Sequence, residues 1–217
     1  MKIQKNSRLV MIGDSITDVS RVRPVGNPRG EGLGKGYVNL VNSMLLTAYP
    51  QLEIGVFNTG CSGNRIIDLE ERWQSDVLDL KPDWLSVMIG INDVWRHFDS
   101  PHSDIQVSIE KYEQVLDELL AKTKPILSGG LILMSPYFIE PNKQEPMRQM
   151  MDAYGLIVKK MAQKYDAIFI DIQAVFDEAT KYHNPTFIAW DRIHPATHGH
   201  MLIARAFLNA IDFDFKN

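Results

Sequence analysis

Residues 9–18 read LVMIGDSITD and predict the first strand of the fold. Four apolar residues end at Gly13 and are followed by a short polar group that contains Ser15. Such a run indicates a buried strand that leads into a loop. In open α/β sheets, ligands bind at the carboxyl ends of the strands. Ser15 is therefore a candidate nucleophile, and a helix N-cap or turn residue is the equal alternative because serine is favoured at both.

Four further apolar runs follow along the chain, at residues 54–57, 84–89, 131–134 and 167–172. Most of them lack strict alternation of apolar and polar residues, which is typical of strands buried on both faces of a parallel sheet. Between them, apolar residues recur at helical spacing, as in residues 112–120, 147–161 and 202–210. We therefore predict an α/β fold, a three-layer sandwich with a five-stranded parallel sheet, in a single domain over residues 1–217.

The composition is that of an ordinary globular protein, with 45% hydrophobic and 23% charged residues. The formal net charge of −4 argues against a nucleic-acid-binding protein, which usually carries a basic excess. No apolar stretch reaches the roughly 18 residues of a membrane span, so no membrane partner is expected. The N-terminus leads into the first strand without a signal peptide, which predicts a cytoplasmic protein. The single Cys61 excludes an internal disulfide and is interpreted as a small buried residue.

Two loops that follow predicted strands offer hydrogen-bond donors. Residues 90–93 read GIND and place the Asn92 side-chain amide just beyond a strand end. A neutral amide donor suits a developing oxyanion, although Asn is also common in turns. Residues 58–64 contain Gly60 and Gly63, whose flexibility lets backbone N–H groups face a ligand. A plain turn that ends in a helix N-cap is the alternative for this second loop.

Another loop follows the last predicted strand and a short helix, and residues 190–195 read WDRIHP. Two residues separate Asp191 from His194, so the loop can fold back and let the carboxylate accept a hydrogen bond from the imidazole Nδ1–H. That bond fixes the tautomer and leaves Nε2 free as a base. Pro195 suits the first turn of a following helix, which places His194 at the helix entrance.

Acyl transfer from an ester requires a nucleophile, a base, a group that orients the base, and donors for the tetrahedral oxyanion. Ser15, His194 and Asp191 match the first three requirements. The backbone N–H groups of Gly63 and Ser15 and the side-chain amide of Asn92 match the fourth. Although Ser15 and His194 lie at opposite ends of the sequence, a parallel sheet brings the loops at its carboxyl edge together.

These motifs resemble those of the SGNH (GDSL-type) hydrolase superfamily. Residues 13–15 match its first sequence block, Gly63 the second, residues 90–93 the third and residues 191–195 the last, in the family's order. The resemblance implies a flavodoxin-like sheet and a Ser-His-Asp hydrolase with no cofactor. It also implies that the matching Ser is the nucleophile, that the matching Gly and Asn complete the oxyanion hole, and that the matching Asp and His complete the triad.

Three longer stretches, residues 12–18, 88–95 and 189–195, resemble the intracellular acetylxylan esterases within that superfamily. Those enzymes remove acetyl groups from xylo-oligosaccharides. The resemblance implies a small-molecule or oligosaccharide ester as substrate, a reaction through a covalent acetyl-enzyme, and no metal ion.

Three aromatic residues in or beside the edge loops are candidate substrate-binding residues, namely Trp95, Tyr137 and Trp190. Stacking on a sugar ring and limiting the acyl pocket are the functional interpretations. Packing in the core or at an interface is the alternative for each. The Gly/Pro-rich residues 24–36 are interpreted as a flexible wall of the site or a subunit contact, so a homo-oligomer is left open.

Three other functions compete with the acetylesterase. A lysophospholipase or thioesterase uses the same catalytic groups on longer acyl chains. A non-catalytic carbohydrate-binding protein on this fold would leave a complete triad unexplained. A metal hydrolase is the third, because His and carboxylate clusters are common metal ligands. Its candidate ligands are Asp14, Asp191, His194, His198 and His200. It is disfavoured because it leaves the serine and the oxyanion donors without a role.

Overall fold

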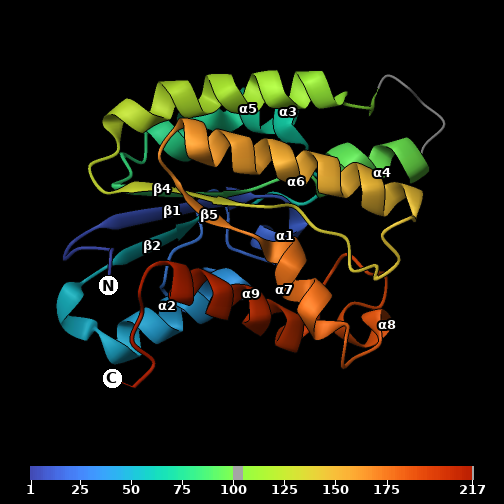
Figure 1. Ribbon diagram of the computed structural model, residues 1–217. Helices are drawn as coiled ribbons and strands as arrows, with labels where there is room; N and C mark the ends of the chain where they lie inside the picture. The colour runs from blue at the N-terminus through green and yellow to red at the C-terminus, as the bar shows by residue number, and fades with distance from the viewer. Residues whose placement is uncertain (100–104, 217) are drawn as a thin grey trace.

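The computed structural model describes residues 1–99 and 105–216. Within these residues, five strands form a parallel sheet in the order β2-β1-β3-β4-β5 (Figure 1). The strands are β1 (Arg8–Gly13), β2 (Gly55–Asn58), β3 (Trp84–Met88), β4 (Gly130–Met134) and β5 (Ile168–Ile170). The predicted α/β sandwich with a five-stranded parallel sheet is confirmed.

Helices cover both faces of the sheet, which gives three layers (Figure 1). One face carries α3 (Ile66–Trp73), α4 (Ile91–Asp99), α5 (Ile109–Thr123) and α6 (Pro146–Lys164). The other carries α2 (Tyr37–Ala48), α7 (Ile172–Ala179) and α9 (Thr197–Ala210). The shorter segments are α1 (Ser15–Asp18), α8 (Pro185–Ile188), the 3₁₀ turns η1 (Pro50–Leu52) and η4 (Lys124–Ile126), and the π-helical turn η2 (Gln74–Leu78). No helix of the described ranges combines the length and apolar character needed to cross a bilayer.

The apolar runs form strands because helices bury both of their faces. Every residue of β3 is buried, and in β1 only Arg8 at the start is exposed. Burying a Val, Leu, Ile or Met side chain stabilises a fold by about 1.5–3 kcal/mol. A run that places such side chains on both faces is therefore stable only between two helical layers, which is why the uninterrupted pattern identifies these strands.

The last strand is shorter than residues 167–172, the range that the sequence predicts. β5 covers Ile168–Ile170, and α7 begins at Ile172. Asp171 ends the strand because its carboxylate caps α7, accepting the backbone N–H of Ala174 at 2.9 Å. The apolar Ile172 therefore belongs to the helix, although periodicity alone cannot separate it from the strand.

The order in which the chain visits the strands reverses between β1 and β3. β2 pairs with β1 on one side, and the next strand, β3, pairs with β1 on the other. In open α/β folds, the crevice at such a reversal is the usual ligand site. Ser15 follows β1 at this point, and Asn92 follows β3. The topology thus brings the candidate nucleophile close to a candidate oxyanion donor.

Gly13 lets the end of β1 approach β3 and α1 closely. Its partner across the sheet is Met88. A Cβ at Gly13 would lie 2.3 Å from the carbonyl oxygen of Met88 and 2.4 Å from Oγ1 of Thr17. Any other residue would displace the strand end or the helix. The glycine of the Gly-Asp-Ser motif is therefore required by packing.

A buried histidine joins α9 to the start of α2. His200 is 5% exposed, and its Nδ1 accepts the backbone N–H of Tyr37 at 3.3 Å. Burial lowers the pKa of His200 from 6.5 to about 4, and the charge of nearby His194 acts in the same direction. The imidazole is thus neutral in the folded protein at neutral pH.

We expect His200 to make the fold sensitive to acid. As the pH falls from about 6.5 to about 4, the unfolded chain binds a proton at His200 and the folded protein does not, so the free energy of unfolding falls. His200→Asn keeps an acceptor for the Tyr37 N–H but does not titrate. Urea unfolding at about pH 7 and about pH 4.5 should show the wild type losing about 2 kcal/mol more than the variant. Equal losses in both proteins would contradict this assignment.

Candidate active site

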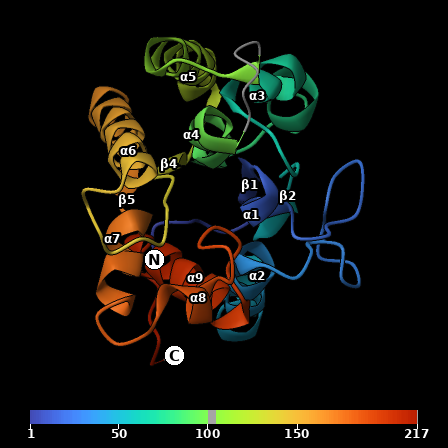
Figure 2. The same cartoon turned by 90° about the vertical axis from the view of Figure 1, so that its right-hand side faces the viewer.

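The carboxyl edge of the sheet brings together segments that are far apart in the sequence. Figure 2 looks onto this edge, where α1, α4 and α8 face the viewer. The loop between α8 and α9 contains Asp191 and His194. Nε2 of His194 lies 2.8 Å from Oγ of Ser15, although the two residues are 179 positions apart.

The three side chains form one hydrogen-bonded line. Oδ2 of Asp191 lies 2.6 Å from Nδ1 of His194, and Oδ1 accepts the backbone N–H groups of Ile193 and His194 at 2.9 and 2.8 Å. Because a carboxylate only accepts, Nδ1 carries the proton, and Nε2 accepts the hydroxyl hydrogen of Ser15. The two-residue spacing of Asp191 and His194 therefore produces the arrangement that the sequence predicts.

Hydrogen bonds keep Asp191 ionised. Burial opposes the charge, but the bonds from the His194 ring and from two backbone N–H groups outweigh it and hold the pKa of this carboxyl below its ordinary value. The side chain of Asp191 is 13% exposed, and that of His194 is 40% exposed. The negative charge therefore stands beside the imidazole, where it can stabilise an imidazolium.

The loop at residues 190–195 is anchored to the segment after β4. Arg192 has a left-handed backbone with a φ of 64°, and its carbonyl accepts the N–H of Ile139 at 2.9 Å. Its guanidinium carbon lies 4.7 Å from the centre of the Phe138 ring, and the group forms an ion pair with Glu140. These contacts hold the tight turn that joins the carboxylate to the imidazole.

The prediction that Tyr137 contacts the substrate is wrong. The side chain is fully buried, and its ring centre lies 4.4 Å from that of Phe176 on α7. Its hydroxyl donates to the carbonyl of Ile193 at 3.0 Å. The ring has no exposed face for a sugar, and the residue instead holds the peptide that precedes His194.

Ser15 is the first residue of α1, and Asp14 is the N-cap. Oδ1 of Asp14 accepts the backbone N–H of Ile16 at 3.0 Å. Burial raises the pKa of Asp14 from 3.8 to about 7, against the opposing effects of this hydrogen bond and of His194. The backbone N–H of Ser15 is one of the groups that a helix start leaves for an external acceptor.

The other two predicted donors come from the loops after β2 and β3. Gly63 has a left-handed backbone with a φ of 83°, and a Cβ there would meet nothing within 4 Å. The need for glycine is therefore conformational, and the space beside it is open. Asn92 is 3% exposed and donates one amide hydrogen to the carbonyl of Asn64 at 3.0 Å. Because a carbonyl only accepts, the amide orientation is fixed and the second hydrogen remains for a ligand.

Two acidic residues that the sequence analysis leaves without a role hold these loops. Asp18 accepts the N–H and the hydroxyl of Ser62 at 3.0 and 2.8 Å and pairs with Arg23. Asp93 accepts the N–H of Ile66, the first residue of α3, at 2.9 Å. Both carboxylates stand within or next to the motifs that contain the nucleophile and the amide donor, which is the signal that points to them.

The two remaining aromatic candidates lie at the border of the site. Trp95 on α4 is half-buried, and its ring centre lies 6.2 Å from that of His194. Trp190 directly precedes Asp191 and is 79% exposed. Their contact with the substrate stays a prediction.

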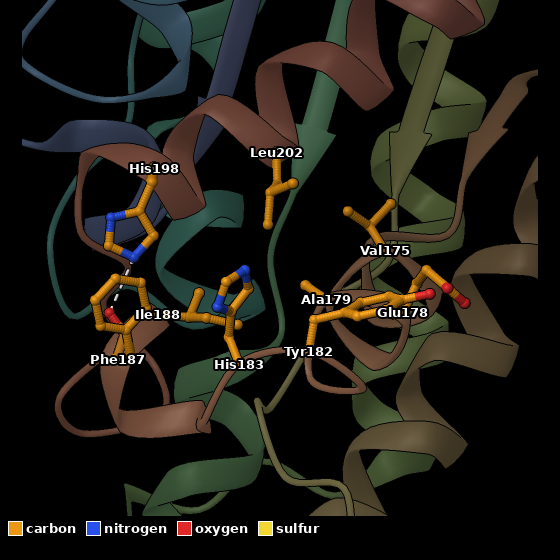
Figure 3. A pocket seen from close by; sticks show the side chains of 9 residues that line it. All are labelled: Val175, Glu178, Ala179, Tyr182, His183, Phe187, Ile188, His198 and Leu202. Carbon is orange, nitrogen blue, oxygen red and sulfur yellow. Dashed lines mark hydrogen bonds between the residues drawn. The ribbon is translucent and has the colours of Figure 1, made fainter.

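A separate apolar pocket of about 680 Å³ lies between α7, α8 and α9 (Figure 3). Its lining residues are Val175, Glu178, Ala179, Tyr182, His183, Phe187, Ile188, His198 and Leu202. None of them belongs to the triad or to the predicted oxyanion donors. His198 donates from Nε2 to the carbonyl of Phe187 at 2.9 Å and stacks on that ring, as Figure 3 shows.

The residues of the metal-hydrolase alternative are engaged in separate contacts. His198 and His200 each bond to a backbone group elsewhere, while Asp191 and His194 bond to each other. Over residues 1–99 and 105–216, no three His, Cys, Asp or Glu side chains gather closely enough to hold a metal ion.

Comparisons with known proteins agree with this geometry. The sequence model of the GDSL-like Lipase/Acylhydrolase family matches residues 11–202. The chain is 49% identical over 216 residues to an acetylxylan esterase of Geobacillus stearothermophilus, which covers 99% of this chain and 98% of that one. The crystal structure of Axe2, an acetylxylan esterase from the same organism, matches with a TM-score of 0.97 at 49% identity, over 99% of this chain and 98% of that chain.

Other solved structures extend the match. Catalytic mutants of Axe2 carrying S15A, D191A or H194A each match with a TM-score of 0.97 at 48% identity, over 99% of this chain and 98% of that chain. LAE5, an alpha/beta hydrolase enzyme from the metagenome of Lake Arreo in Spain, matches with a TM-score of 0.95 at 46% identity over 98% of both chains. The resemblance that the motifs indicate is thereby confirmed, and the chain belongs to the GDSL-like lipase/acylhydrolase family.

Proposed function

We propose that this protein is a serine esterase that removes acetyl groups from acetylated xylo-oligosaccharides. The observation that carries the proposal is the unbroken hydrogen-bonded line from Asp191 through His194 to Ser15. A nucleophilic serine needs such a line, because the base must reach its proton and must itself be oriented by a third group. The near full-length similarity to an acetylxylan esterase supports the substrate class.

In the first half of the proposed reaction, Nε2 of His194 takes the hydroxyl proton of Ser15 while Oγ attacks the acetyl carbonyl carbon. The resulting oxyanion accepts hydrogen bonds from the backbone N–H groups of Ser15 and Gly63 and from the amide of Asn92. Asp191 stabilises the imidazolium. The bond to the sugar oxygen then breaks, and His194 donates its proton to that oxygen. The products are an acetyl ester on the serine and a free sugar hydroxyl.

In the second half, a water molecule takes the place of the sugar. His194 removes a proton from the water, whose oxygen attacks the acetyl carbon of the ester on Ser15. The second oxyanion uses the same three donors. When it collapses, Oγ of Ser15 recovers a proton from His194, and acetate leaves. Side chains, backbone N–H groups and water supply every group in this proposed cycle.

The aromatic residues at the border suit two parts of such a substrate. Trp190 offers an exposed ring next to Asp191, and a sugar face stacks on such a ring. Trp95 stands near His194 and limits the room for the acyl group. We further propose that the protein acts in the cytoplasm, where it would meet imported oligosaccharides and not the polymer.

The first prediction concerns the nucleophile and the acyl group. On aryl esters from acetyl to decanoyl, the wild type should be fastest on the acetyl ester, and it should also act on acetylated xylo-oligosaccharide. Ser15→Ala should lose at least roughly 1,000-fold in kcat and keep its fold. Ser43→Ala is the matched control, because Ser43 is exposed on α2 and its hydroxyl donates to the carbonyl of Asn39, one turn earlier in the same helix.

Two outcomes would replace this function with another. Rates that rise toward long acyl chains would favour the lysophospholipase or thioesterase. If Ser15 contributes to the hydrolysis of none of these esters, the result would favour the non-catalytic carbohydrate-binding protein.

The second prediction concerns the oxyanion. Asn92→Ala should lower kcat by about 100- to 1,000-fold with little change in KM, because the amide bonds the transition state more strongly than the substrate. Steady-state kinetics on an aryl acetate measures both constants, and circular dichroism checks the fold. A folded variant with a kcat near that of the wild type would remove Asn92 from the oxyanion hole.

The third prediction separates sugar binding from chemistry. Trp190→Ala should raise KM for acetylated xylo-oligosaccharide roughly 3- to 10-fold, the size expected for one lost stacking contact. The same variant should retain kcat/KM on an aryl acetate within about twofold. Trp190→Phe keeps a ring and should bind the oligosaccharide nearly as well as the wild type. An equal loss on both substrates would argue against a sugar contact.

A further inference from the structure

A guanidinium behind the site bonds to three segments at once. Arg72 lies in the last turn of α3, and its side chain is 17% exposed. Nε donates to Oδ1 of Asn64 at 2.6 Å, Nη1 to the carbonyl of Thr59 at 2.6 Å, and Nη2 to the carbonyl of Gly13 at 3.1 Å. Nη1 also donates to Asp76, one turn further along the helical segment.

The acceptors of this guanidinium are next to the groups proposed to bind the oxyanion. Gly13 precedes Ser15 by two residues. Asn64 follows Gly63 directly, and its carbonyl accepts the amide of Asn92 at 3.0 Å. The guanidinium therefore ties together the ends of β1 and β2 and, through one intervening residue, the end of β3.

An ion pair that only stabilises the helix does not explain this arrangement. Pairing with Asp76 uses one nitrogen of the guanidinium, and a lysine could supply that single donor. The bonds to Asn64, Thr59 and Gly13 leave the helix and reach the loop after β2 and the end of β1. A planar group with several fixed donors makes them all from one side chain.

We propose that Arg72 and Asn64 form a positioning pair that holds the N–H of Gly63 and the amide of Asn92 where the oxyanion develops. This inference rests on the proposed esterase function. Arg72 fixes the side chain of Asn64, which restrains the peptide that follows Gly63, and the carbonyl of Asn64 fixes the amide of Asn92. Donors that are aimed in advance need no reorganisation during the reaction, so the pair affects the transition state more than the bound substrate.

Arg72→Lys tests the pair because it keeps the charge and loses the planar set of donors. On an aryl acetate, kcat should fall roughly 10- to 100-fold with KM within about twofold. An arylboronic acid forms a tetrahedral adduct with Ser15, and its affinity should fall by the same factor. Arg65→Lys is the matched control and should keep kcat, because Arg65 at the start of the same helix bonds to Asp68 and to the carbonyl of Ile105.

Asn64→Ala removes the other side chain of the pair. This variant still tests the proposal if Arg72→Lys fails to fold. Its kcat should fall in the same range. The double variant Arg72→Lys/Asn64→Ala should fall no further than the larger single effect, because both changes remove the same interaction.

A folded Asn64→Ala or Arg72→Lys protein with wild-type kcat and wild-type boronate affinity would overturn the positioning role. An equal loss of kcat in Arg65→Lys would also overturn it and assign the effect to the helix. Activity that persists in Ser15→Ala would instead overturn the proposed function, so the two failures are distinguishable.

Discussion

The pairing of β1 with β3 is the constraint on which the rest of the site depends. Gly13 lies opposite Met88, and no side chain fits between the end of β1 and the Met88 carbonyl. This contact sets the gap between the segments that continue into Ser15 and Asn92. The loop after β2 and the loop between α8 and α9 are then arranged around the ends of β1 and β3, whose separation this contact fixes.

Buried polar groups hold those loops, and their charge states differ. Asp93 is fully buried, and its Oδ2 has no hydrogen-bond partner within the described part of the chain. Burial raises the pKa of Asp93 to about 7. Its carboxyl, which caps the start of α3, is therefore partly neutral near pH 7, and burying a neutral carboxyl costs less free energy of desolvation than burying an ionised one. At Asp18 burial also opposes the charge, but Arg23 and Ser62 outweigh it and lower the pKa. The carboxylate of Asp18 bonds to Ser62 and Arg23 together, and such a network holds the segments it joins rigidly.

The sequence predicts the strands and the pairing of Asp191 with His194 because their signals are local, whereas the approach of His194 to Ser15 follows from the parallel sheet. Apolar runs identify strands, and the spacing of Asp191 and His194 within one loop is compatible with only a tight turn. Tyr137 shows where local signals end, since the exposure of its ring depends on Phe176 from a distant helix. Arg72 is harder still to predict. Two of its acceptors are backbone carbonyls, which every residue offers, so no sequence pattern marks them.

Because His194 is 179 residues away from Ser15, the reactivity of the serine belongs to the whole fold. In a chain whose loop at residues 190–195 has not yet docked, Ser15 is an ordinary alcohol with no base beside it. Covalent labelling of its hydroxyl by an acylating reagent would then report the completion of tertiary assembly. Labelling kinetics during refolding would time the docking of the loop that contains His194.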